Sequence, residues 1–138
     1  MGLNYTKSQE EVDIMPSNVE AIITQEITVF FNPGKYFTNS VAYASRNDWS
    51  RAIRVYVMEE PGNPWDFPNG MEAELTFRRP DNYQGLSYDI DIKPDGILDV
   101  KLTREITSIP GDCLCNIFLM HNGDRVGLQN FTLHIEDC

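Results

Sequence analysis

Two pairs of carboxylates have the spacing that places side chains on one face of a β-strand. Glu72 and Glu74 form one pair, and Asp89 and Asp91 form the other. Strand geometry separates each pair by about 7 Å, a distance at which an acid and a base could act on a glycosidic bond. The solvated face of any strand has the same appearance in a chain of net charge −10, and we favour that interpretation. No dense Asp/Asn/Gly loop accompanies the pairs to make a specific cation site.

Zinc could be bound by four side chains, those of Cys113, Cys115, His121 and Cys138. However, Cys113 and Cys115 are closer in sequence than the paired ligands of structural zinc sites, which have two to four residues between them. We interpret both as small buried residues of one strand face, and we predict no metal site. An odd number of cysteines is not a disulfide framework and favours synthesis in a reducing cytoplasm.

The two histidines offer no catalytic arrangement. His134 lies on the polar side of the last predicted strand, and His121 precedes a predicted turn at Asn122-Gly123. The chain also lacks a nucleophile elbow, a glycine-rich phosphate loop, a zinc-protease helix motif and a dinucleotide fingerprint. We therefore predict that the protein is not an enzyme and uses no cofactor.

Aromatic residues in or near predicted loops are the remaining candidates for a functional surface. Exposed rings anchor protein interfaces or stack on sugars, whereas rings at the open ends of a sandwich cap its core. Capping, protein contact and sugar contact all stay open as interpretations at this point. The candidate interface residues are Trp49, Trp65, Phe67 and Tyr83.

Charge and length limit the class of protein. The chain has 138 residues, enough for one domain, with eleven Lys and Arg against twenty-one Asp and Glu. This surplus of acid repels nucleic-acid phosphate and anionic lipid, so neither is an expected partner. The chain has no apolar run long enough for a membrane span and no secretory signal peptide.

The elements that position these residues are predicted to be strands. From Glu20 onward, apolar and polar residues alternate, which indicates strands with one buried and one solvated face. Cys113–Met120 is apolar on nearly both faces, which predicts a central strand covered on both sides or a strand whose outer face meets a partner. Asp95-Gly96 is a strong hairpin signal. The apolar positions that share a parity are Ile23, Ile27, Val29 and Phe31; Ile53, Val55 and Val57; Met71, Ala73, Leu75 and Phe77; Tyr88, Ile90 and Ile92; Leu98, Val100 and Leu102; and Phe131, Leu133 and Ile135.

Seven or eight short strands with frequent turns predict an all-β, antiparallel β-sandwich over residues 20–138. A small barrel is the alternative architecture. Residues 1–19 are polar and contain Pro16, so we predict a short amino-terminal arm or docking segment there.

The stretch 45–82 has a hairpin order of strand, Pro/Gly-rich loop, strand and Pro-Asp turn. Its marked positions are Arg46, Asp48 and Ser50; Gly62, Pro64 and Asp66; Phe67 and Gly70; and Pro80 and Asp81, followed by Pro94-Asp95-Gly96 and Pro110-Gly111. With these motifs the chain resembles the amino-terminal domain of the upper baseplate protein of tailed phages that infect Gram-positive bacteria, and the similarity extends over residues 20–137.

The resemblance implies an immunoglobulin-like β-sandwich without catalysis, in a protein of the virion tail. It also implies that the chain attaches receptor-binding parts to the tail, with other tail and baseplate proteins as partners. Homo-oligomerisation as a trimer or a multiple of three would follow from the same assembly. The alternative function is a carbohydrate-binding β-sandwich that recognises sugars of the bacterial cell surface.

Overall fold

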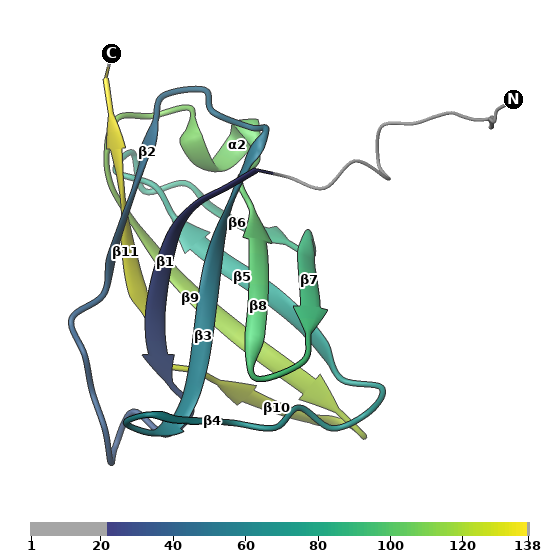
Figure 1. The fold of residues 1–138 in the computed structure, drawn as a ribbon. Coiled ribbons are helices and arrows are strands. Elements are labelled where there is room, and N and C mark those ends of the chain that lie inside the picture. The colour runs from purple at the N-terminus through teal and green to yellow at the C-terminus, as the bar shows by residue number, and fades with distance from the viewer. Residues whose placement is uncertain (1–21, 138) are drawn as a thin grey trace, which may run out of the picture.

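The computed structural model describes residues 22–137, so the predicted arm over residues 1–19 lies outside the described residues. In this part of the chain, a five-stranded sheet packs against a six-stranded sheet, and a short helix lies at one end (Figure 1). The predicted all-β sandwich is confirmed. Its formation follows from the alternating pattern, because each strand has one apolar face to bury against the opposite sheet.

The five-stranded sheet has the order β1-β3-β8-β7, and β4 pairs with the end of β3. Strands β1 and β7 are therefore its edges. The bounds of these strands are β1 Ile22–Phe30, β3 Arg51–Glu60, β4 Asn63–Pro64, β7 Ile90–Lys93 and β8 Ile97–Lys101.

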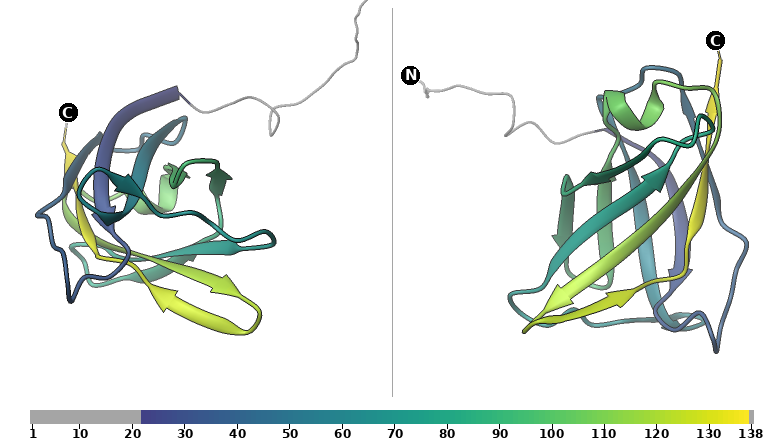
Figure 2. Two further views of the ribbon diagram at one scale, coloured as in Figure 1. Left: turned by 60° about the horizontal axis from the view of Figure 1, so that its bottom comes forward. Right: turned by 180° about the vertical axis from the view of Figure 1, so that it is seen from behind.

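The six-stranded sheet has the order β2-β11-β9-β5-β6, and β10 pairs with β9; Figure 2 (right) shows this sheet from behind. The long strand β9 lies in its middle, as the apolar run Cys113–Met120 predicts. The bounds are β2 Val41–Ser45, β5 Glu72–Arg78, β6 Gln84–Ser87, β9 Gly111–His121, β10 Asp124–Gly127 and β11 Phe131–Glu136, and the short helix is α2 Arg104–Thr107.

The strand pairing is mixed, whereas the sequence pattern predicts a purely antiparallel sandwich. Strand β1 pairs with β3 in parallel, and β2 pairs with β11 in parallel. The chain passes from β1 to the other sheet as β2 and then returns as β3, so β3 runs in the same direction as β1. Three short strands, β4, β6 and β10, also add to the seven or eight predicted.

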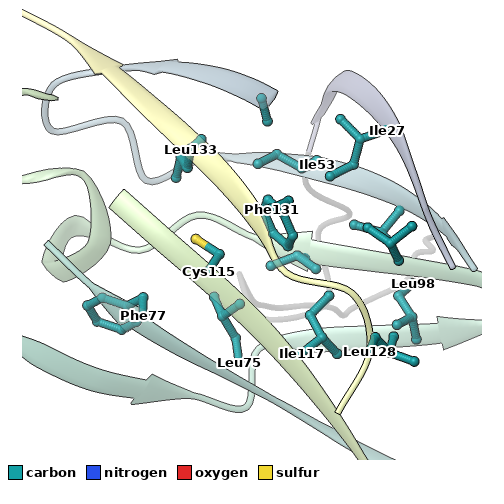
Figure 3. Close-up of a cluster of buried hydrophobic side chains, with 14 of the residues drawn as sticks. Ile27, Ile53, Leu75, Phe77, Leu98, Cys115, Ile117, Leu128, Phe131 and Leu133 are labelled. Carbon is teal, nitrogen blue, oxygen red and sulfur yellow. The ribbon is translucent and has the colours of Figure 1, made fainter. Parts of the chain in front are cut away.

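The core between the sheets is built from the predicted apolar positions (Figure 3). Ile53, Leu75, Leu98 and Leu133 are each at most 1% exposed. Two predictions are exceptions. Ile23 is only partly buried and lines a small pocket on the outer face with Arg54 and Asp99, because the pairing of β1 with β3 shifts register after Ile23. In the predicted strand over 88–92, Tyr88 is 65% exposed. Strand β7 starts only at Ile90 and forms the sheet edge, where one side has no neighbouring strand to cover it.

The hairpin turns explain how consecutive strands are joined. Asp95 and Gly96 have φ angles of 66° and 74°, and Asn122 and Gly123 have φ angles of 52° and 85°. Two successive positive φ angles are the mark of a type I′ turn, the connection that matches the twist of paired strands. Both predicted tight hairpins, β7–β8 and β9–β10, are therefore confirmed.

Candidate interaction surfaces

The four predicted interface residues lie in two separate groups at opposite ends of the sandwich. We call these ends the α2 end and the β4 end after the elements found there (Figure 1). Trp49 and Tyr83 contact residues at α2, whereas Trp65 directly follows β4 and packs with Phe67. The structure therefore does not bring the four residues together into one site.

Helix α2 is a short element that holds the loop before β3 in place. The Thr103 side chain caps it by accepting a hydrogen bond from the backbone N–H of Ile106. The Thr107 hydroxyl donates to the carbonyl of Asp48 at 2.8 Å, and the Asn47 amide donates to the carbonyl of Thr107 at 2.8 Å. These bonds fix the loop that carries Trp49 beside the helix. The alternating pattern did not predict α2, although Thr103 followed by an acid in the first turn is a capping signal.

Each exposed ring at the α2 end pairs with an arginine. Trp49 is 57% exposed, and the Arg104 guanidinium lies over its ring at 4.9 Å from the centroid. Tyr83 is 43% exposed, with the Arg79 guanidinium at 4.3 Å from its centroid. A cation over an aromatic face is attracted by the ring quadrupole and orients the ring. We call Trp49, Tyr83, Arg79 and Arg104 together the α2 patch.

Ionic and hydrogen bonds hold the Tyr83 side of this patch. Arg79 forms an ion pair with Asp81 at 2.8 Å and donates to the hydroxyl of Ser108 at 2.8 Å. The hydrogen bond from Arg79 lowers the pKa of Asp81. The Tyr83 hydroxyl donates to Glu105, and this bond raises the pKa of Tyr83. The patch is therefore charged and preorganised at neutral pH. Sequence reasoning missed both arginines. Arg104 meets Trp49 only through the fold, whereas Arg79 lies four residues from Tyr83 across a local turn, a signal that was present in the sequence.

The rings at the β4 end cover the edge of the core. Trp65 stacks on Phe31 with centroids 4.2 Å apart, and Phe67 meets Trp65 edge-on at 5.5 Å. All three are partly buried and pack against the core cluster. One face of Trp65 is thus occupied by protein, as in the capping interpretation. A partner contact by Trp65 or Phe67 stays a prediction.

One member of each predicted carboxylate pair, Glu74 or Asp91, forms an ion pair on the outer face of its sheet. Glu74 is only 7% exposed and accepts two hydrogen bonds from Arg125, at 2.9 and 2.8 Å. Asp91 lies 3.8 Å from Lys101. The expectation that Glu74 is solvated is therefore corrected, because the Arg125 side chain covers it. This guanidinium also lies over the ring of Phe118 at 3.7 Å from the centroid.

Asp99 is a second outward-facing carboxylate that is buried, at 3% exposure. The sequence pattern places it on a solvated face. Arg54 donates to both of its oxygens, at 2.8 and 2.9 Å, and Lys93 lies 2.9 Å away. The hydrogen bond from Arg54 is the main cause that lowers the pKa of Asp99. Three strands, β3, β8 and β7, are tied together by this carboxylate.

The cysteines and histidines lie apart from one another. Cys113 and Cys115 are buried in the core as predicted, and Cys138 lies outside the described residues. The Nε2 atom of His121 lies 3.0 Å from the carbonyl oxygen of Asn69, and His134 Nδ1 lies 2.7 Å from Asp112. Over residues 22–137 no three His, Cys, Asp or Glu side chains gather as a metal-binding group.

The helices of residues 22–137 include none that is long and apolar enough to cross a membrane.

Comparisons with known proteins support the fold. No protein-family model matches the chain, and neither does any curated protein. Among solved structures, the fold is similar to the N-terminal domain of phage TP901-1 ORF48, with a TM-score of 0.58 and 11% sequence identity. The match covers 83% of this chain and 100% of that chain. At this identity the likeness shows a shared fold, and it is the fold of a phage protein domain.

Proposed function

We propose that this chain is a non-enzymatic structural module of a phage or prophage tail baseplate, which binds other tail proteins. The fold likeness to a complete phage protein domain is the observation that carries the proposal. The motif resemblance described for residues 20–137 points to the same role. On this proposal the protein resides in the virion tail, in a copy number of three or a multiple of three.

The α2 patch is the surface that best fits a protein partner. Trp, Tyr and Arg are the residue types that dominate binding energy at protein interfaces. Here two exposed rings and two arginines lie around one short helix, and each ring is already oriented by its arginine. Preorganised side chains lose little conformational entropy on binding. The carboxyl end of strand β11 lies at the α2 end of the sandwich as well (Figure 1).

The first experiment is mass spectrometry of particles sedimented after prophage induction of the source bacterium. We expect the chain in tail particles at a fixed ratio to other tail proteins. Its presence in the soluble fraction alone, after confirmed induction, contradicts the baseplate role.

The second experiment tests the α2 patch within that role. We expect Trp49→Ala with Tyr83→Ala to lower co-purification with tail proteins by about 30-fold or more, as for interface hot spots. The matched control is Phe37→Ala, because Phe37 is a 67% exposed ring in the β1–β2 connection. Equal co-purification of the double variant and the control would exclude the α2 patch as the binding surface. It would not contradict the baseplate role.

A further inference from the structure

The outer face of the six-stranded sheet carries an open groove of about 470 Å³. It crosses strands β6, β5 and β9 and extends to the residue before β11. Two leucines, one on each side, supply its apolar surface: Leu86 is 52% exposed and Leu114 is 47% exposed. Arg78, Gln84, Asn116 and Asn130 are among the other lining residues. We call this the β6 groove.

The β6 groove carries one positive charge that no residue lining the groove balances. Arg78 is the one charged residue among those that line it, and no carboxylate lines it. On the outer face of the other sheet, Arg54 and Lys101 are each matched by an aspartate. Arg78 is exposed, and within residues 22–137 no ion pair or hydrogen bond of its guanidinium is found. The β6 groove therefore fits a segment that carries both carboxylates and apolar side chains.

The backbone at the groove favours an extended segment. Strand β6 pairs with β5 on one side and forms the edge of the six-stranded sheet on the other. An edge strand presents unpaired N–H and C=O groups that can pair with another extended chain. Covering this edge also removes a site for unwanted pairing between molecules.

The chain itself contains a segment of the required chemistry. Residues 10–15 read Glu-Glu-Val-Asp-Ile-Met, which combines three carboxylates with three apolar side chains. Eleven residues lie between Glu10 and Ile22, where β1 begins, and an extended chain over these twelve Cα–Cα steps spans up to about 40 Å. Since packed sheets lie about 10 Å apart, this length is enough to pass around the end of the sandwich.

We propose that residues 10–15 of the same chain bind in the β6 groove, with their carboxylates at Arg78 and their apolar side chains on Leu86 and Leu114. Tethering gives the segment an effective concentration on the order of millimolar, so even weak contacts keep it bound. This assignment does not depend on the partner proposed above, since it concerns contacts within one chain.

The test is photo-crosslinking in the full chain, with p-benzoylphenylalanine in place of Leu86. Trypsin releases residues 8–35 as one peptide, and fragment ions locate the new bond within it. We expect bonds to residues 10–15, and in a mixture of ¹⁵N-labelled and unlabelled protein we expect them within single chains. The control position is Ile92, a 37% exposed residue of β7 on the other sheet, which should give none of these bonds. Bonds that join labelled to unlabelled chains, or bonds to other segments, overturn the proposal.

Charge-reversal variants, measured by their crosslink yield, provide a second test of the proposal. Arg78→Glu should lower the crosslink yield about fivefold, which corresponds to the loss of one partly exposed ion pair. Glu11→Lys together with Asp13→Lys should restore it in the Arg78→Glu background. Gln84→Glu adds a carboxylate at an exposed neighbouring position and should also lower the yield. Lys35→Glu is the control, at an exposed lysine of the β1–β2 connection. Equal yields from Arg78→Glu and Lys35→Glu refute the proposed pairing.

Discussion

Asp99 offers the sharpest test of how the five-stranded sheet is held together. Its carboxylate is nearly buried, yet it faces outward and is covered by two cations. Arg54 binds both oxygens and Lys93 approaches to 2.9 Å, with the side chains of Arg54 and Lys93 27% and 32% exposed. Asp99→Asn keeps the shape of the side chain and removes the charge. The two cations then lose the carboxylate charge that they share.

The expected cost follows from the burial of the three side chains. Removing one partner of a fully buried ion pair costs about 3–5 kcal/mol, and exposed pairs are worth about 0.2–1 kcal/mol. Asp99 is buried, whereas both cations keep contact with water, so the cost lies between these ranges. We expect Asp99→Asn to lower the free energy of unfolding by about 2 kcal/mol. In a domain of this size that corresponds to roughly 6–10 °C in the midpoint temperature.

Urea unfolding at pH 7 measures this change, with Asp91→Asn as the matched control. Asp91 lies 3.8 Å from Lys101 and its side chain is 50% exposed, so its substitution should cost less than about 0.5 kcal/mol. Equal effects of the two substitutions would refute the reasoning.

Acid gives an independent check. Because the pKa of Asp99 is lowered in the folded state, its stabilisation is present above the unfolded pKa of about 3.9. This stabilisation is lost as the pH falls through the folded pKa. The difference in the free energy of unfolding between wild type and Asp99→Asn should therefore become smaller as the pH falls through the folded pKa of Asp99.

Three further predictions concern single positions. Gly96→Ala should cost about 1–3 kcal/mol in urea unfolding, because the new Cβ would lie 2.7 Å from the carbonyl oxygen of Val57 at a φ of +74°. Gln129→Leu should cost about 2–4 kcal/mol by the same assay, since Gln129 is 2% exposed and accepts hydrogen bonds from two backbone amides. His134 should titrate by NMR above its usual pKa of about 6.5, because Asp112 hydrogen-bonds to it. Its contribution to stability is thus full at low pH and is lost as the pH rises through the raised pKa, and Asp112→Asn should lower that pKa.

The buried faces of most strands could be predicted from short stretches of sequence. A strand exposes alternate residues to opposite sides, so a window of five to seven residues already contains the signal. Ile53, Val55 and Val57 illustrate this, since all three are at most 1% exposed. The turn at Asp95-Gly96 is also local, because its conformation depends on two residues that tolerate positive φ.

The α2 patch could be predicted only in part. Trp49 and Tyr83 stand out in the sequence as aromatic residues near turns, and the structure confirms that both are exposed. The partner of Trp49 could not be found in this way, because Arg104 lies 55 residues from Trp49 in the chain and meets it only through α2. Arg79 is only four residues from Tyr83, but the alternating pattern does not show that its side chain lies over the ring. Likewise, the alternating pattern correctly places Trp65 outside a strand, but it does not predict that Trp65 stacks on Phe31.

Local sequence was enough to predict the class of fold, the buried side of most strands, two hairpin turns and the acidic surface. Three features emerged only from the folded molecule: the parallel pairing of β1 with β3, the burial of Asp99 and Glu74 beneath distant cations, and the separation of the predicted aromatic residues into two ends. This division follows from the range over which each interaction acts. Side-chain periodicity and turn preference act over a few residues, whereas sheet order and ion pairing depend on which distant segments meet when the two sheets close on their core.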